Sequence, residues 1–238
     1  MLLETLKAIT RPVRRRARVL LGRDLSFAPE IRVPVEVHGT EYGGFALLRD
    51  SLTAQSTVLS FGIGEDASFD LSVIAQYGCT VCAFDPTPKS VAWVGRTVGD
   101  ARFCFSPKAV AATDGTIRLY LPTNPAHVSA SVRAGAHTRN EAVDVPGRRL
   151  ATIVSDLNLE TIDVLKMDIE GAEYAVLADY FATPGVPLPR QLAVEFHHFW
   201  PAFGLDATRG ALALLRARGY RIAWVSPSHH ELLFVRGQ

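Results

Sequence analysis

A glycine turn between an apolar run and a helical pattern restricts the folds that are open to this chain. Thr57–Phe61 is a short apolar run typical of a buried strand, and Gly62-Ile63-Gly64 follows it directly. Phe69–Tyr77 then has helical spacing, and Asp85 ends the next apolar run, about 20 residues beyond the turn. Glycines here let a ligand approach the backbone, and the acid is placed to hydrogen-bond ribose hydroxyls. This arrangement predicts a nucleotide-type ligand at the turn.

The same alternation of strand and helix patterns continues along the chain. Strands are predicted over 57–61, 80–84, 102–112, 116–121, 162–167, 191–196, 220–225 and 231–235, and helices over 69–77, 90–98, 173–180 and 208–218. Residues 123–147 are polar and lack a clear period, so we expect a long functional loop there. Repeated alternation of this kind predicts an α/β fold with a mostly parallel sheet covered by helices on both faces.

The charge distribution divides the chain into two parts. Of the first 24 residues seven are basic and two are acidic, whereas the chain as a whole has a net charge of only +1. We expect an N-terminal basic helical extension over 1–35 and one catalytic domain over 36–238. The near-neutral total argues against a dedicated nucleic-acid binder. The basic helix could pack on the body or a partner chain, bind a membrane surface, or cap the substrate.

Two absences in the sequence suggest a compartment. No apolar run approaches the length of a transmembrane helix, and the N-terminus lacks the regions of a signal peptide. The three cysteines, Cys79, Cys82 and Cys104, give no disulfide framework and fit a reducing environment. We therefore expect a cytoplasmic protein.

Two acids next to the glycine turn indicate which ligand binds there. Glu65 and Asp66 lie where a dinucleotide would place its pyrophosphate, and their carboxylates would repel it. S-adenosylmethionine carries no phosphate, and it has a sulfonium and an ammonium group that the acids would attract. The chain is therefore expected to be an S-adenosylmethionine-dependent methyltransferase. The expected cofactor contacts are Ser60, Gly62, Gly64, Glu65, Asp66 and Asp85.

A second polar group follows two later strands. Asp168 and Glu170 come after the predicted strand 162–167, and Glu195 and His197 stand at the end of 191–196. Ligands of doubly wound sheets bind beyond the carboxyl ends of strands, so we expect these four side chains to be catalytic. His197 is suited to take a hydroxyl proton at neutral pH, with Asp168 and Glu195 orienting it or the acceptor. Glu173 has an equally simple interpretation, as an acid favoured by the dipole of its helix.

Further assignments concern the acceptor and a metal. Ser129 and Ser131 in the predicted loop, and His198 beside His197, are expected to contact the methyl acceptor. The set formed by Asp168, Glu170, Glu195 and His197 could also hold Mg²⁺, Mn²⁺ or Ca²⁺. Nothing in the spacing requires a divalent cation, so no metal ligand is assigned from the sequence.

These motifs resemble those of the FkbM-type methyltransferase family. The segment 166–173, Lys-Met-Asp-Ile-Glu-Gly-Ala-Glu, is similar to the hallmark of that family, and segments 60–66, 84–86 and 194–197 resemble others, in the expected order. The resemblance covers roughly residues 36–236. It implies a seven-stranded sheet of order 3-2-1-4-5-7-6 with strand 7 antiparallel, and O-methylation of sugars or natural products. The chain departs from many such enzymes at Ser60, where they carry an acid.

Two other functions fit parts of the pattern. An NAD-dependent oxidoreductase would also have a glycine turn followed by an acid. A methyltransferase fold without catalysis could serve as a binding module for a partner protein. The presence of Asp85, Asp168 and His197 argues against the second alternative.

Overall fold

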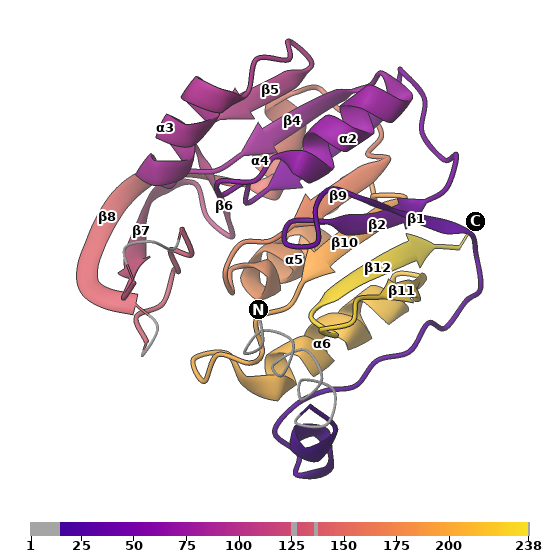
Figure 1. Ribbon diagram of the computed structural model, residues 1–238, viewed down its shortest axis with the longest axis vertical. Helices are drawn as coiled ribbons and strands as arrows, with labels where there is room; N and C mark the ends of the chain where they lie inside the picture. Colours follow the sequence, from indigo (N-terminus) through magenta and orange to yellow (C-terminus); the bar gives the residue numbers. More distant parts are fainter. Residues whose placement is uncertain (1–14, 125–127, 136–137, 238) are drawn as a thin grey trace, which may run out of the picture.

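The computed structural model describes residues 15–124, 128–135 and 138–237. A mixed sheet of seven strands forms its centre (Figure 1). Its order is β11-β12-β10-β9-β3-β4-β5. The strands are β3 (Thr57–Phe61), β4 (Thr80–Phe84), β5 (Phe103–Ser106), β9 (Val164–Met167), β10 (Gln191–Glu195), β11 (Tyr220–Val225) and β12 (Glu231–Arg236). β12 is antiparallel to both neighbours, whereas the pairs from β10 to β5 are parallel.

Numbered as they come along the chain, these seven strands read 3-2-1-4-5-7-6 across the sheet. The expected α/β class with a mostly parallel sheet is confirmed. The described part of the chain has more strands than expected, because two smaller sheets accompany the central one. One pairs β1 (Val35–His38) with β2 (Phe45–Leu48), and the other joins β6 (Ala109–Ala111), β8 (Thr138–Arg149) and β7 (Gly115–Pro122).

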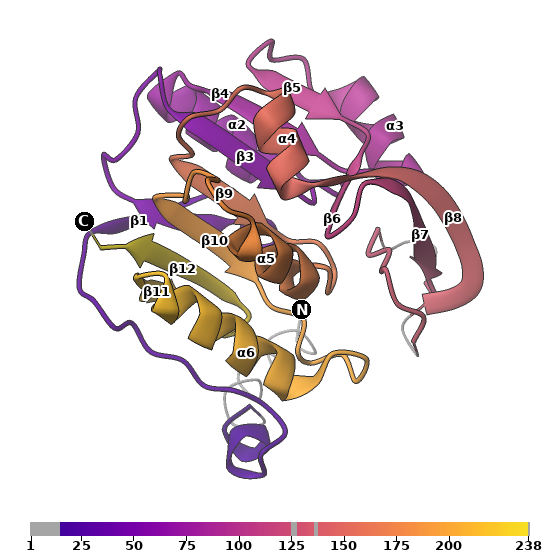
Figure 2. The same ribbon diagram turned by 180° about the vertical axis from the view of Figure 1, so that it is seen from behind.

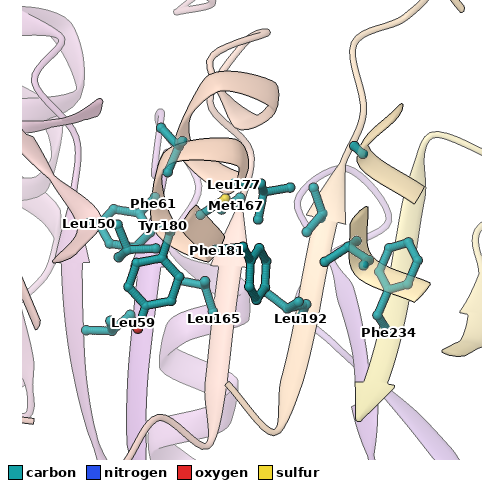
Figure 3. Close-up of a cluster of buried hydrophobic side chains, with 14 of the residues drawn as sticks. Leu59, Phe61, Leu150, Leu165, Met167, Leu177, Tyr180, Phe181, Leu192 and Phe234 are labelled. Atoms are coloured by element: carbon teal, nitrogen blue, oxygen red, sulfur yellow. The ribbon is translucent and has the colours of Figure 1, made fainter. Parts of the chain in front are cut away.

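Helices cover both faces of the central sheet, because alternate strand residues point to opposite sides. Leu59 and Phe61 of β3 pack on the face covered by α4 (Leu150–Asp156), α5 (Glu173–Ala182) and α6 (Gly204–Ala217), which lie in front in Figure 2. Figure 3 shows Tyr180 and Phe181 of α5 against Leu165 and Leu192 on this face. Val58 packs on the opposite face with α2 (Ser68–Tyr77), α3 (Pro88–Thr97) and the β1–β2 pair.

The long loop predicted over residues 123–147 is wrong in its second half. β8 begins at Thr138 and pairs antiparallel with β7, with Leu119 opposite Val143 and Ile117 opposite Val145. The alternation of Val143 and Val145 with polar residues is a strand signal, and the nearby Pro146 and Gly147 obscured it. The paired strands project beside the central sheet (Figure 1). The connection between β7 and β8 is therefore shorter than expected, and parts of it lie outside the described residues.

The described part of the N-terminal extension runs along the outside of the domain (Figures 1 and 2). Asp24 Oδ1 lies 3.1 Å from His198 Nε2, the Phe27 amide donates to His229 Nδ1 at 3.1 Å, and Glu30 pairs with Arg216 at 2.6 Å. Residues 15–20 are helical, as expected, and residues 1–14 lie outside the described part. Within the described residues no helix is both long and apolar enough to cross a membrane.

Candidate active site

One cavity of about 730 Å³ lies at the carboxyl ends of the central strands. It is lined by the glycine turn after β3, by Asp85 after β4, by Asp168 and Glu170 after β9, and by Glu195 and His197 at the end of β10. The two groups that the sequence predicts as separate sites therefore share one space. The cavity sits where ligands of parallel α/β sheets bind, because the carboxyl ends of adjacent strands meet there.

The glycine turn is packed directly against the segment that carries Asp168. Gly62 has φ +82°, and a Cβ added to it would lie 1.6 Å from the carbonyl oxygen of Asp168. Gly64 has φ +60°, and its Cβ would meet only the Val128 side chain, at 3.1 Å. Gly62 is therefore required by both backbone conformation and space. Gly64 is favoured by conformation and keeps the backbone open to the cavity.

Asp85 holds this turn in place through hydrogen bonds. Its Oδ2 accepts from the amides of Ile63 and Gly64 at 3.0 and 2.8 Å. Its Oδ1 accepts from the amide of Thr87 at 2.8 Å and from the Thr87 hydroxyl. A carboxylate has about four acceptor sites, so the carboxylate is fully used by these contacts. A ribose hydroxyl would have to displace one of them, so the ribose role of Asp85 stays a prediction.

The two acids of the turn line the cavity with their partners already in place. Glu65 pairs with Lys89 at 2.8 Å, and Asp66 accepts from the Thr40 hydroxyl at 2.6 Å and the Ser68 amide at 2.8 Å. Burial raises the pKa of Asp66, but the hydrogen bonds from Ser68 and Thr40 outweigh it and leave the pKa below its ordinary value. The carboxylate of Asp66 therefore remains charged beside the glycine turn.

Ser60 does not reach the ligand space. Its side chain is completely buried and is absent from the cavity wall. Ser60 has the same parity in β3 as Val58, so it points to the α2 face of the sheet rather than to the open end. The expectation that Ser60 contacts the cofactor is therefore corrected.

Lys166 is a cavity residue that the sequence analysis missed. Ser60 and Lys166 are register partners in the parallel pair β3–β9. Lys166 is buried, its Nζ donates to the carbonyl oxygens of Gly62 and, at 3.4 Å, Phe61, and it lies 5.1 Å from the centre of the Phe45 ring. Its position inside the apolar strand Val164–Met167 could have identified Lys166 from the sequence, because a buried lysine requires specific partners. Lys166 therefore connects β9 to the glycine turn through hydrogen bonds.

His197 is the centre of the acidic group. Its Nε2 lies 3.1 Å from Glu170 Oε2, 3.7 Å from Asp168 Oδ1 and 4.0 Å from Glu195 Oε1. The imidazole is almost completely buried, and its ring centre is 5.0 Å from that of Trp200. The carboxylates of Asp168 and Glu195 are 32% and 20% exposed, so they reach the cavity. The four residues that the sequence assigns to catalysis are therefore brought together.

Glu173 is the closest partner on the other side of this ring. Its side chain is 0% exposed, and its Oε1 lies 3.2 Å from His197 Nδ1 and accepts from the His197 amide at 3.0 Å. Its Oε2 accepts from the Gly171 amide at 2.8 Å. Interpreting Glu173 as a helix-dipole acid therefore missed its role. It fixes the position of His197 from the first turn of α5.

Opposing effects act on the ionisation of this group. Burial lowers the pKa of His197, but Glu173 and Glu170 outweigh it, so the pKa lies well above its ordinary value. Burial raises the pKa of Asp168, and the charge of Glu170 adds to this. Burial and the charge of Asp168 raise the pKa of Glu195 well above its ordinary value. The carboxylates thus compete for the positive charge of the imidazole.

Two of the three expected acceptor contacts are placed elsewhere. Ser131 is fully buried, and its hydroxyl donates at 2.9 Å to the carbonyl of Glu170, which has the left-handed φ of +56°. His198 is buried behind the cavity, where it contacts Asp24. Neither side chain lines the cavity, so both assignments are corrected. Ser131 positions Glu170, and His198 anchors the N-terminal segment. Ser129 does line the cavity.

Comparison with known sequences gives one family. A family model described as the methyltransferase FkbM domain matches residues 54–222, well over half of the chain. The chain is 26% identical over 170 residues to "Probable methyltransferase-like protein 24" of Rattus norvegicus, covering 71% of this chain and 40% of that protein. It is 28% identical over 172 residues to the protein of the same name from Homo sapiens, covering 69% and 38%. The chain thus spans about 40% of the length of these curated relatives.

Two solved structures share a general similarity. A fibrillarin pre-rRNA processing protein of Methanococcus jannaschii aligns with 81% of this chain and 70% of its own, at 12% identity and a TM-score of 0.44. A methyltransferase from Pyrococcus furiosus aligns with 98% of this chain and 99% of its own, at 15% identity and a TM-score of 0.39.

Proposed function

The chain belongs to the FkbM methyltransferase family, and on that premise we propose that it transfers a methyl group from S-adenosylmethionine to a hydroxyl of a small acceptor such as a sugar or natural product. The observation that carries this proposal is the shared cavity, in which the glycine turn faces the acidic group around His197. A methyl transfer needs its two reactants side by side, and one cavity at the strand ends provides that arrangement.

The residues around the turn fit this cofactor. The backbone at Gly64 leaves room for close approach, and the charged Asp66 lines the cavity for a ligand that carries an ammonium and a sulfonium group. Its charge would oppose a pyrophosphate, which disfavours NAD. When bound, S-adenosylmethionine supplies a methyl group that is already strongly electrophilic. The protein then has to orient the acceptor and take up its proton.

Geometry favours Glu195 over His197 as the group that takes this proton. Both ring nitrogens of His197 face carboxylates, Nδ1 toward Glu173 and Nε2 toward Glu170, so neither is left for a hydroxyl. Glu195 reaches the cavity from the end of β10 and stays 4.0 Å from His197, beyond hydrogen-bond distance. In this proposal Asp168, whose carboxylate reaches the cavity, orients the acceptor, and His197 holds the surrounding carboxylates in place.

Transfer of an isotope-labelled methyl group tests this function. The full chain is incubated with ¹³C-methyl S-adenosylmethionine and panels of sugar, polyketide and lipid-linked acceptors, and products are analysed by NMR. We expect label on oxygen of at least one hydroxylated acceptor. Label found on nitrogen or carbon, with none on oxygen, would contradict O-methylation while leaving methyl transfer intact.

A further inference from the structure

The wall of the cavity contains three possible metal ligands that lie close together. The atoms belong to Asp168, Glu170 and His197, and one ligand atom of each lies within 4.8 Å of the others. The set combines two carboxylates with one imidazole, and all three residues line the cavity.

Glu173 fixes which nitrogen of His197 carries a hydrogen. Its carboxylate can only accept, and it faces Nδ1 at 3.2 Å while it also accepts from the backbone amides of His197 and Gly171. Nδ1 must therefore carry the hydrogen, and in a neutral ring the lone pair sits on Nε2. A carboxylate that orients a histidine in this way is a common outer partner of metal ligands.

Opposite this nitrogen lie two carboxylates. Nε2 belongs to a side chain that is only 3% exposed, and it is aimed at Glu170 Oε2 at 3.1 Å and Asp168 Oδ1 at 3.7 Å. These carboxylate oxygens also offer lone pairs. A proton on Nε2 connects the ring to one carboxylate oxygen at a time, whereas a divalent cation in its place would contact all three atoms.

The spacing of the three atoms suits a divalent cation. Neighbouring ligands of an octahedral ion with bonds near 2.1 Å lie about 3 Å apart, close to the 3.1 and 3.7 Å measured from Nε2. We propose that Asp168, Glu170 and His197 bind one divalent metal ion, with the remaining coordination positions open to the cavity. Two carboxylates and an imidazole lie between the ligand preferences of Mg²⁺ and Zn²⁺, a range that includes Mn²⁺.

The consequence for catalysis rests on the proposed function. An acceptor hydroxyl that coordinates the ion would lose its proton more readily, as metal-bound water does. Glu195 is not part of the three-atom set and lies beside it, so it would remain available to take that proton.

A second group of possible ligands provides a matched control. Asp24, His198 and His230 also lie within 4.8 Å of one another. Three contacts hold the Asp24 carboxylate: the Leu25 amide donates to Asp24 Oδ1 at 2.8 Å, His198 Nε2 lies at 3.1 Å, and Arg18 approaches Oδ2 at 3.6 Å. This group is held together without a cation, so we expect it to bind none.

Mn²⁺ alone is the probe, because its electron paramagnetic resonance signal decreases when the free ion is bound. We expect the full chain to bind one Mn²⁺, and Asp168→Asn and His197→Gln each to weaken binding at least about tenfold. His230→Gln should leave the affinity unchanged. Pulsed resonance of the wild-type complex should show coupling to one imidazole nitrogen, and this readout does not depend on whether a variant folds.

Three results would overturn the metal site. The first is no Mn²⁺ bound at up to ~1 mM, a concentration far above the dissociation constants of physiological sensor sites. The others are unchanged binding in folded Asp168→Asn and loss of binding in His230→Gln. Calorimetry with S-adenosylmethionine is run on the same samples. A chain that binds Mn²⁺ but not S-adenosylmethionine would leave the metal site intact and contradict the proposed function. The reverse result would remove the metal and keep methyl transfer.

Discussion

Replacing Gly62 with alanine is expected to destabilise the domain by about 2–5 kcal/mol, combining left-handed strain with overpacking. The new Cβ would lie 1.6 Å from the Asp168 carbonyl oxygen, a backbone atom that cannot move away without shifting β9. The measurement is the free energy of unfolding in urea, together with the affinity for S-adenosylmethionine. Both should fall, since the same contact joins the glycine turn to the acidic group.

Gly95→Ala is the matched control for this substitution. Gly95 lies in α3 on the exposed side, and a Cβ built on it meets nothing within 4 Å. Alanine is favoured over glycine in a helix by up to about 1 kcal/mol, so this variant should unfold at equal or higher urea. An unfolding midpoint for Gly62→Ala equal to that of the wild-type chain would show that the two strand ends are not packed as described.

Glu195→Gln is expected to lower kcat by about 10²–10⁴, the usual effect of losing a positioned base. Glutamine keeps the shape of the side chain and removes its ability to take a proton. Glu195 belongs to the acidic group and not to the glycine turn, so the affinity for S-adenosylmethionine should change little. The measurement is kcat and KM for both substrates, once an acceptor is available. A loss confined to kcat identifies a residue of the chemical step.

His197→Gln is the informative comparison for this prediction. This substitution removes the imidazole, which would be needed if His197 were the general base, and it retains Glu195. If Glu195→Gln keeps full turnover and His197→Gln loses it, the proton is taken by His197, and our assignment of Glu195 is wrong. If both variants lose turnover and Glu195→Gln loses more, Glu195 takes the proton, as the contacts of the two ring nitrogens of His197 indicate.

Much of the central sheet was predictable because its signals are local. The apolar runs 57–61, 80–84 and 191–196 coincide closely with β3, β4 and β10, and the hairpin of β11 and β12 appears where expected. Residues 138–147 were not recognised, because strand pairing with β7 determines their structure and because Pro146 and Gly147 obscured the alternation of Val143 and Val145. Long-range pairing of this kind leaves little trace in a single sequence.

The candidate site was predicted where it depends on strand ends and missed where it depends on packing between elements. The carboxyl ends of β9 and β10 are adjacent in a parallel sheet, so Asp168, Glu170, Glu195 and His197 could be grouped before the structure was known. The role of Glu173 depends on how α5 docks against His197, and that of Ser131 depends on its contact with Glu170. Neither contact follows from sequence spacing.

His198 was expected at the cavity because of its place in the sequence, and the structure places it elsewhere. It follows His197 directly, yet its ring turns away from the cavity to Asp24 of the N-terminal segment. Beyond the last paired residue of β10 the chain no longer alternates, so neighbours in sequence separate in space. The N-terminal extension thus contacts the residue next to His197. The basic charge of the extension did not predict this contact.

Calorimetric titration shows which ligand binds at the glycine turn. S-adenosylmethionine and NAD⁺ are titrated separately into the full chain under the same conditions. The negative charge of Asp66 near Gly64 predicts that S-adenosylmethionine binds at one site per chain, and that NAD⁺ shows no saturable binding. Saturable binding of NAD⁺ in the absence of S-adenosylmethionine binding would contradict the account.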